Sequence, residues 1–233
     1  MKKVRLGMIG CGRISKNHFE AVAQIPEAEF VACADIIEDK AKAAAELYKI
    51  PNSYKDYHEM LEKEKLDLVC ICSPSGMHPQ MGMDVAAHKV NVLTEKPMGI
   101  NIDGADKLIQ ACDRNGVELF VVKQNRLNST MQLLKRAVDK ERFGRIYLAQ
   151  SNVFWTRPQS YYDQEKWRGT WEFDGGAFMN QASHYVDAIY WLLGNVDSVM
   201  ATTATMARHI EAEDTGCAIL NFRSGIIVTL NVT

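Results

Sequence analysis

The sequence predicts two domains of different class, an α/β domain followed by an α+β domain. Apolar runs alternate with amphipathic stretches in the first half of the chain, a pattern typical of a parallel sheet with crossover helices. Two runs, LDLVCICS and NVLTE, are apolar at both alternating sets of positions, as in strands that helices cover on both faces. We therefore expect a doubly wound parallel sheet in residues 1–122 and a mainly antiparallel open sheet in residues 123–233.

The elements of the first domain follow from short apolar runs and longer amphipathic stretches. The expected order begins with strand 4–9, helix 14–24, strand 28–35, helix 38–48 and helix 55–63. It continues with strand 67–72, helix 77–88, strand 90–94, helix 101–115 and strand 118–122.

The second domain is expected to begin with a helix at 128–139 and a long strand at 144–156. A helix from Ala177 to Leu193 would place apolar side chains on one face and Asn180, His184 and Asp187 on the other. Strands are expected near 196–206, 214–222 and 226–233. Because the sequence ends inside the last apolar pattern, we expect this domain to be incomplete at its C-terminus.

Composition and charge are those of an ordinary globular protein, with 47% apolar residues, 24% charged residues and a formal net charge of -2. Since no basic run is present, nucleic acid and anionic membrane surfaces are not expected as partners. The N-terminal apolar stretch is too short and too broken by glycine for a signal peptide or a membrane span, so we expect a cytoplasmic protein.

Neither the cysteines nor the histidines have the spacing of metal ligands. The six cysteines are expected to be reduced thiols of the core. The candidate histidines fall into no pattern such as H-E-x-x-H, so no metal site is predicted among His58, His78, His88, His184 and His209.

The segment GMIGCGRIS joins the first expected strand to the first helix. Gly10 and Gly12 occupy the first two positions of the G-x-G-x-x-G pattern, and Ser15 occupies the third. The first glycine permits a tight turn, and the second lets backbone N–H groups approach a pyrophosphate at the helix N-terminus, where Arg13 and Ile14 follow. The pattern is typical of a Rossmann dinucleotide-binding domain.

Asp35 ends the second expected strand, where a carboxylate can accept hydrogen bonds from both hydroxyls of an adenosine ribose. Ile36 and Ile37 follow it, so that a 2′-phosphate would meet a carboxylate with no arginine beside it. The sequence therefore predicts NAD rather than NADP as the cofactor. The alternative is that Asp35 is only a turn residue at the strand end.

Two loops, SPSGMH and TEKPMG, follow the fourth and fifth strands, at the carboxyl ends where an open α/β sheet binds its ligands. Five of their residues are expected to line the cofactor site: Ser73, Pro74, His78, Glu95 and Lys96. Pro97 restricts Lys96 to extended conformations, and a lysine fixed there can stabilise a developing alkoxide or act as a base. The alternative is a surface lysine in a proline turn.

With the glycine loop, Glu95-Lys96-Pro97 and DGGAFMNQASHYVD in this order, the chain resembles the glucose–fructose oxidoreductase/inositol dehydrogenase (Gfo/Idh/MocA) family. The resemblance implies hydride transfer between NAD(P) and a sugar or cyclitol hydroxyl, with Lys96 and His184 as catalytic residues. It also implies a C-terminal open sheet used for oligomerisation, so we expect a homodimer or homotetramer.

Asn180 departs from the family pattern, in which the position four residues before the histidine is often Asp. Asn180 can hydrogen-bond but cannot hold a charge, so either His184 or Lys96 could be the general base. The glycine pair Gly175-Gly176 would allow a ligand to approach the start of this helix closely. Further site residues are expected near the cofactor, Gln124 and Arg168, and near the substrate, Arg157 and Gln181.

Residues 151–194 are more narrowly similar to the branch of UDP-N-acetyl-2-amino-2-deoxy-D-glucuronate dehydrogenases, which oxidise the C3 hydroxyl of the sugar. With such a substrate, Asn180 in place of Asp removes a like-charge repulsion of about 1–4 kcal/mol at about 4 Å. Arg157 and Arg168 can then pair with carboxylate or diphosphate. The alternatives are a dehydrogenase of a free sugar or cyclitol, a non-catalytic NAD-binding sensor, and an aromatic segment 154–171 that packs against a neighbouring subunit.

Overall fold

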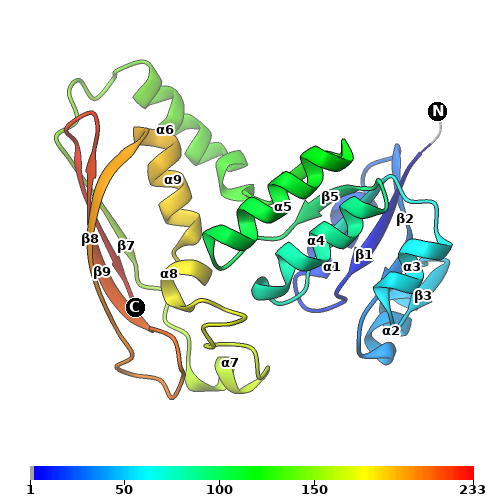
Figure 1. The fold of residues 1–233 in the computed structure, drawn as a ribbon. Helices are drawn as coiled ribbons and strands as arrows, with labels where there is room; N and C mark the ends of the chain where they lie inside the picture. Colours follow the sequence, from blue (N-terminus) through cyan, green and yellow to red (C-terminus); the bar gives the residue numbers. More distant parts are fainter. Residues whose placement is uncertain (1–2) are drawn as a thin grey trace. The chain divides into compact units, whose positions relative to one another are not determined.

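A computed structural model describes residues 3–233 of the chain (Figure 1). The contacts of the chain divide it into two compact units, Met1–Val122 and Lys123–Thr233.

The first unit is built on a six-stranded parallel sheet of order β3-β2-β1-β4-β5-β6. Its strands are β1 (Val4–Ile9), β2 (Ala28–Ala34), β3 (Asn52–Tyr54), β4 (Leu68–Ile71), β5 (Asn91–Thr94) and β6 (Leu119–Val121). The order confirms the predicted doubly wound sheet, and it reverses between β1 and β4, where such sheets bind their ligands. Strand β3 was not predicted, because three residues are too few to show an alternating pattern.

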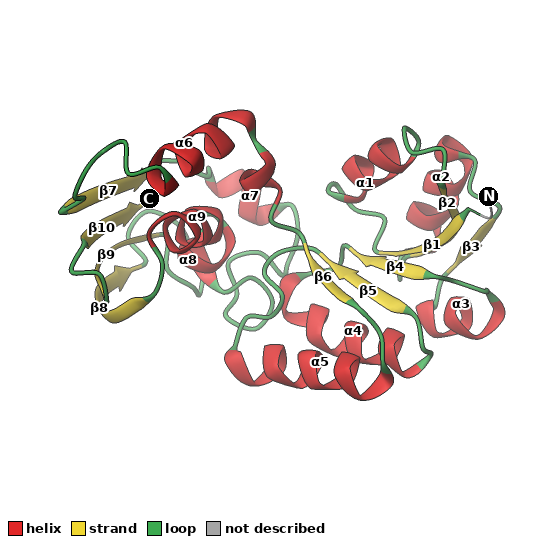
Figure 2. Ribbon diagram, turned by 90° about the horizontal axis from the view of Figure 1, so that it is seen from above, coloured by secondary structure: helices red, strands yellow, loops and turns green. Residues whose placement is uncertain are grey.

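The helices of the first unit are α1 (Ser15–Val22), α2 (Glu38–Tyr48), α3 (Tyr57–Lys63), α4 (His78–Ala87) and α5 (Ile102–Asn115), with the 3-10 helix η1 (Ser75–Met77). Figure 2 shows α1 and α2 on one face of the sheet and α4 and α5 on the other. Neighbouring residues of β4 serve the two faces: Cys70 packs in the core that contains Phe19, and Val69 in the core that contains Leu108. Because helices cover both faces of the sheet, strand β4 has no alternating set of polar side chains.

The second unit contains a four-stranded sheet of order β7-β10-β9-β8. The strands are β7 (Leu148–Val153), β8 (Val196–Ala204), β9 (Thr215–Phe222) and β10 (Ile227–Val232). Strand β9 is antiparallel to both of its neighbours, whereas β7 runs parallel to β10. The predicted mainly antiparallel sheet is therefore confirmed, with one parallel pair and a shorter β7 than expected.

The helices of the second unit are η2 (Gln124–Leu127), α6 (Ser129–Asp139), α7 (Gln159–Asp163), α8 (Gly176–Asn180) and α9 (Ser183–Leu193). The single helix expected from Ala177 to Leu193 was wrong, since the segment forms two helices. The backbone N–H of Ala182 donates to the carbonyl oxygen of Ala177, five residues earlier, at 2.9 Å. Such a widened turn shifts every later side chain by one position around the helix, or about 100°.

The expected apolar face of α9 is correct for Ala182 and Ile189 and wrong for Tyr185. His184 was expected on the polar face and Tyr185 on the apolar face. In the structure His184 is 9% exposed and Tyr185 is 38% exposed. Ala182 and Ile189 still pack against the sheet.

Helix α9 is held at its polar side by an ion pair with η2. The guanidinium of Arg126 donates from Nε and Nη2 to the two carboxylate oxygens of Asp187, at 2.8 and 2.7 Å. The Lys123 ammonium lies 3.8 Å from the same carboxylate. This two-pronged contact fixes direction as well as distance, so α9 cannot rotate without breaking it.

The expectation of six reduced thiols in the core is met for most of the cysteines. All six cysteines are free, and Cys33, Cys70, Cys72 and Cys112 are buried. The expectation of a core position was wrong for Cys217, which is exposed on the outer face of β9. Among the helices of residues 3–233, none combines the length and the apolar character that crossing a membrane requires.

Glu213 caps helix α8 from a buried position before β9. Its carboxylate Oε1 accepts the N–H of Phe178 at 3.0 Å, and its carbonyl oxygen accepts the N–H of Ala177 at 3.0 Å. A Cβ on Gly176, whose φ is +84°, would lie 1.9 Å from Glu213 Oε2. The fold therefore requires Gly176 for the close approach of Glu213, and its approach to a ligand stays a prediction.

Burial raises the pKa of Glu213, and the neighbouring Asp174 raises it further, against the lowering effect of the backbone N–H groups. The carboxyl group of Glu213 thus holds its proton more tightly in the folded protein than in the unfolded chain. The stability that comes from the bound proton is complete below the unfolded pKa of 4.5 and is lost as the pH rises through the folded value.

We expect Glu213→Gln to become more stable relative to the native protein as the pH rises from about 5 to about 8, because the amide never ionises in the buried site. Urea unfolding followed by tryptophan fluorescence measures this, since all four tryptophans lie in residues 123–233. The exposed Glu172→Gln serves as the control for removing one surface charge. A constant difference between Glu213→Gln and the native protein at every pH would contradict the expectation.

Candidate functional site

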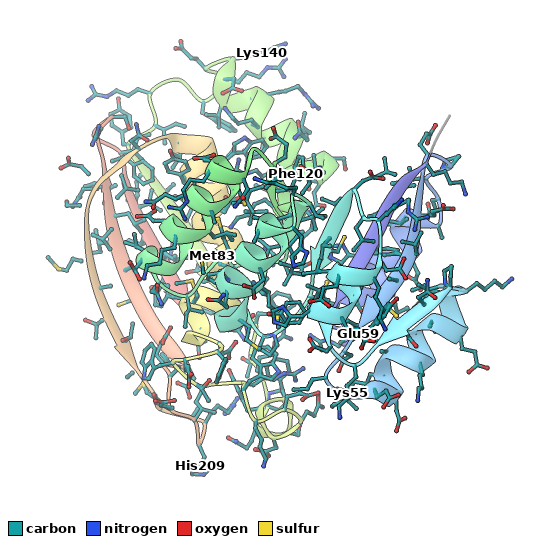
Figure 3. All side chains as sticks on the ribbon, turned by 45° about the vertical axis from the view of Figure 1, so that its right-hand side comes forward. Lys55, Glu59, Met83, Phe120, Lys140 and His209 are labelled. Atoms are coloured by element: carbon teal, nitrogen blue, oxygen red, sulfur yellow. The ribbon has the colours of Figure 1, made fainter. Side chains whose placement is uncertain are left out.

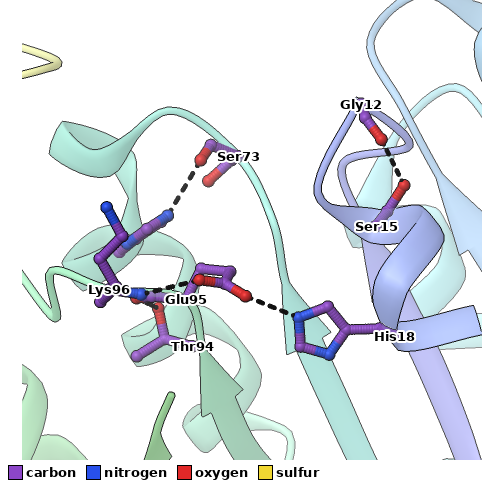
Figure 4. Close-up of polar contacts among 8 residues, drawn as sticks. Gly12, Ser15, His18, Ser73, Thr94, Glu95 and Lys96 are labelled. Carbon is purple, nitrogen blue, oxygen red and sulfur yellow. Dashed lines mark hydrogen bonds and ion pairs between the residues drawn. The ribbon is translucent and has the colours of Figure 1, made fainter. Parts of the chain in front are cut away.

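The glycine loop lies at the carboxyl end of β1 and is held in place by its own unit. Gly10 has a φ of +90°, and a Cβ there would lie 2.7 Å from the carbonyl oxygen of Cys72, so the fold itself requires this glycine. A Cβ on Gly12 would meet nothing within 4 Å. Since neither sterics nor φ demands glycine at this position, the open space beside Gly12 is available to a ligand. Ser15 Oγ donates to the carbonyl oxygen of Gly12 at 2.6 Å (Figure 4).

Asp35 holds the glycine loop and retains capacity for a ligand. One carboxylate oxygen accepts the N–H of Cys11 and the other accepts the N–H of Ile37, both at 2.8 Å. A carboxylate has about four acceptor positions, so about two remain. Ile36 is 82% exposed beside it. The turn role and the ribose role, stated above as alternatives, are chemically compatible.

Glu95 is a buried carboxylate at the end of β5, next to Lys96. Its Oε1 lies 2.8 Å from Nε2 of His18, and its Oε2 accepts the N–H of Lys96 at 3.2 Å. Burial raises the pKa of Glu95, but the contacts with His18 and Lys96 outweigh this and hold it below its usual value. Figure 4 shows His18 and Lys96 on opposite sides of the Glu95 carboxylate.

His18 was missed by the sequence reasoning, although a signal for it exists. It lies one helical turn after Ser15, on the same side of α1 as the buried Ser15 and Phe19. A polar ring on a buried helix face needs a hydrogen-bonding partner, and Glu95 is that partner. The helix that follows the glycine loop is thus tied to the strand end that carries Lys96.

His78 ties the two predicted loops together. Its ring is 1% exposed, with Nδ1 2.7 Å from the carbonyl oxygen of Pro97 and Nε2 2.9 Å from that of Ser73. Burial lowers the pKa of His78, although both carbonyl groups favour the charged ring. Its hydrogen-bonding atoms are therefore occupied by the backbone of the loops, which makes it a support of the Lys96-Pro97 segment.

Asp174 and Asn180 form the polar centre of the second unit. Asp174 is 1% exposed. Its Oδ2 accepts the N–H of Gly169 at 2.7 Å, and its Oδ1 accepts a hydrogen bond from Nδ2 of Asn180. Two predicted residues, Gln181 and His184, follow on the widened turn and the first turn of α9, and both are buried. The structure therefore brings three predicted residues together in one short segment.

Two arginines of the segment 154–171 stack on aromatic rings. The Arg157 guanidinium lies 4.1 Å from the ring centre of Trp155 and 5.1 Å from that of Tyr161. Arg168 lies 4.1 Å from the ring centre of Tyr161, and its Nη1 donates to the carbonyl oxygen of Tyr161 at 2.7 Å and to Gln164 at 3.2 Å. Part of the hydrogen-bonding capacity of Arg168 is thus used within its own segment.

A small cavity of the second unit brings together donors from two segments. Arg157 and Gln181 both line it, beside Trp155, Arg208 and Asp214. Within residues 3–233, Nε of Arg157 and Nε2 of Gln181 are buried without a hydrogen-bond acceptor. The cavity, of about 20 Å³, has room for a single water molecule beside these donors.

Of the remaining predicted residues, Arg13 and Gln124 are exposed, and Ile14 is exposed at the start of α1. Pro74 immediately precedes η1. No group of three or more histidine, cysteine or acidic side chains within residues 3–233 is arranged to hold a metal ion. His209, for example, lies in the loop between β8 and β9 (Figure 3), where its backbone N–H donates to Gln159.

Comparisons with known proteins agree with the predicted family. Residues 4–123 match the family described as oxidoreductases with an NAD-binding Rossmann fold, and residues 131–233 match the Gfo/Idh/MocA C-terminal domain. The myo-inositol 2-dehydrogenase of Thermotoga maritima is 27% identical over 231 residues, which cover 96% of this chain and 66% of that protein.

Two solved structures are more similar. The WlbA dehydrogenase of Bordetella pertussis, crystallised with NADH and UDP-GlcNAcA, is 50% identical with a TM-score of 0.97, over 100% of this chain and 71% of that one. The WlbA dehydrogenase of Chromobacterium violaceum, with the same two ligands, is 49% identical with a TM-score of 0.98, over 100% and 68%. The chain thus spans about two thirds of the length of these relatives. From the two matched domains, the chain belongs to the Gfo/Idh/MocA oxidoreductase family.

Proposed function

We propose that this protein is an NAD-dependent dehydrogenase that oxidises a hydroxyl group, at C3, of a UDP-linked N-acetylated hexuronate in the cytoplasm. The observation that carries the proposal is the 50% identity over the whole chain to a dehydrogenase crystallised with NADH and UDP-GlcNAcA. We assign residues 1–122 to cofactor binding and residues 123–233 to substrate binding and oligomerisation.

The first unit fits NAD on its own geometry. The open space beside Gly12 suits a pyrophosphate at the start of α1, and the remaining acceptor positions of Asp35 suit the two ribose hydroxyls. A 2′-phosphate in that position would be repelled by the Asp35 carboxylate, which favours NAD over NADP. When bound, NAD supplies the hydride acceptor for the reaction.

We expect Gly12→Val to fold normally but to weaken NADH binding by about tenfold or more, because the new side chain occupies the space that the pyrophosphate needs. NADH fluorescence titration measures the affinity, and thermal unfolding without ligand measures folding. Gly10→Val provides the contrast, since its Cβ would collide with the backbone of Cys72 and lower the thermal stability itself. Unchanged NADH affinity in Gly12→Val would exclude this loop as the phosphate site.

We assign the chemical step to Lys96 and His184. Lys96 follows a strand end that Glu95 and His78 hold in place, which suits a cation that must stabilise charge developing on the substrate oxygen. A histidine has an ordinary pKa of about 6.5, which suits removal of the hydroxyl proton near neutral pH. The two roles can also be exchanged, with Lys96 as the base.

Substrate binding is supported by the charge of Arg157, a half-buried residue of the aromatic segment 154–171. A guanidinium suits the carboxylate of a hexuronate or the diphosphate of a nucleotide sugar. Arg157 keeps its stacking on Trp155 in such a complex, so the aromatic side chains of the segment serve to hold the arginine.

We expect UDP-GlcNAcA to reduce NAD in the presence of the native protein, and Lys96→Ala to lose about a thousandfold or more of that turnover while its NADH affinity stays unchanged. Absorbance of NADH reports the rate. The exposed Lys107→Ala is the matched control. Turnover of myo-inositol or glucose without turnover of UDP-GlcNAcA would replace the proposal by the cyclitol or free-sugar alternative, and NADH binding with no turnover of any sugar would favour a sensor.

The outer face of the second sheet supports self-association. In β7, β10 and β9, the side chains that alternate with the buried set are uncharged, and so are the β8 residues in register with those of β9. The residues are Leu148, Gln150, Asn152, Ile227, Thr229, Asn231, Cys217, Ile219, Asn221, Ser198, Met200 and Thr202. Register places them side by side, with Ile219 opposite both Thr229 and Met200. A solvated face is usually rich in lysine and glutamate, so this face suits a second copy of the chain.

We expect the native protein to be a dimer or tetramer and Ile219→Lys to shift it towards smaller species, because a charge in the centre of an uncharged contact is left unpaired. Light scattering after size-exclusion chromatography gives the mass. Ile25→Lys, at a similarly exposed isoleucine of the first unit, is the control. A monomeric native protein would refute the assignment.

A further inference from the structure

We propose that Asp174 is a positioning residue that fixes the side-chain amide of Asn180, so that position 180 presents a neutral hydrogen-bond acceptor to the substrate site. The inference deepens the proposed function and rests on it for the kinetic part. In this arrangement the buried Asp174 carboxylate carries the negative charge of the segment, and the uncharged amide of Asn180 contacts the ligand.

The orientation of the Asn180 amide follows from the chemistry of its partner. Both oxygens of Asp174 are acceptors, one for the N–H of Gly169 and one for the amide of Asn180. Only the NH2 group of an asparagine can donate, so Nδ2 must face Asp174 and Oδ1 must face elsewhere. With the amide turned around, two acceptor oxygens would meet in a buried place, which is a costly arrangement.

Asp174 is itself held rigidly. Its backbone N–H donates to the carbonyl oxygen of Thr170 at 3.1 Å, and its side chain holds Gly169. The carbonyl oxygen of Gly169 in turn accepts the N–H groups of Glu211 and Ala212, at 3.0 and 2.8 Å. The carboxylate is thus connected through Gly169 to the segment before β9.

Asn180 is held from its other side as well. It is the last residue of α8, whose first turn is capped by Glu213. Its carbonyl oxygen accepts a hydrogen bond from Ser183 Oγ at 3.2 Å, at the start of the helix that carries His184. The position of Asn180 and the direction of its amide are therefore both set by buried contacts.

A fixed acceptor without charge has a consequence for specificity. An aspartate at position 180 would also accept a hydrogen bond, but it would repel a substrate that carries a carboxylate or a diphosphate. In the proposed arrangement the carboxylate stays one hydrogen bond further from the substrate, on the buried Asp174. The arrangement favours anionic substrates over neutral sugars.

The test uses Asp174→Asn, Asn180→Asp and the double variant that exchanges the two residues. In the double variant, the new asparagine at position 174 can accept the N–H of Gly169 with Oδ1 and donate from Nδ2 to the new carboxylate at position 180. The hydrogen bond therefore returns in the reverse direction.

We expect each single variant to unfold at a lower temperature than the native protein, and the double variant to recover at least half of the larger loss. Such recovery is the signature of direct coupling. Asp163→Asn, at an exposed carboxylate that also accepts from an amide, is the control and should change little.

The kinetic readout separates positioning from folding. With UDP-GlcNAcA, we expect the double variant to be stable yet to have a KM raised about tenfold or more, with a smaller change in kcat, because its charge now faces the substrate. We also expect its pH profile to gain an inflection from the carboxylate introduced at position 180, absent from the native profile.

Two results would overturn the proposal. The first is additive loss of thermal stability in the double variant, which would show that the residues are not coupled. The second is an unchanged KM in a double variant that is stable. A native protein that is inactive on UDP-GlcNAcA would instead refute the proposed function, while the thermal coupling would still decide whether Asp174 positions Asn180.

Discussion

The contact between the His18 ring and the buried Glu95 carboxylate is the one on which the arrangement of the first unit depends. It connects the helix that starts at the glycine loop to the end of the strand that carries Lys96. The two groups are far apart in the sequence and belong to different strand-helix units. With this contact in place, the glycine loop and Lys96 keep a constant relation to one sheet, and Lys96 gains a fixed backbone position through the second oxygen of Glu95.

Carboxylates of three other residues also accept backbone N–H groups and order loops. Asp35 holds the backbone of the glycine loop, Asp174 holds Gly169, and Glu213 holds the start of α8. Each accepts backbone N–H groups that loops would otherwise leave unsatisfied. The loops are therefore ordered by side chains rather than by regular structure, which allows them to carry site residues in conformations that helices and strands do not offer.

The sequence predicted those features that depend on local pattern. Alternation of apolar and amphipathic runs is sufficient for a doubly wound sheet, and the first glycines with Asp35 are sufficient to locate a dinucleotide turn. The division of residues 177–193 into two helices was missed, because a hydrogen bond from Ala182 to Ala177 widens one turn and periodicity assumes that every turn is equal. Neither His18 as the partner of Glu95 nor Glu213 as the cap of α8 could be derived from spacing, since both contacts join segments that only the tertiary fold brings together.

The widened turn before α9 also restricts how this segment can change during evolution. Loss of one residue between Asp174 and Ser183 would restore a regular helix and turn His184 by about 100° away from its buried position. The ion pair of Asp187 with Arg126 would oppose any compensating rotation of the helix. In an alignment of sequences with this site, the stretch from Asp174 to Asp187 should therefore tolerate exchanges of side chains far better than insertions or deletions.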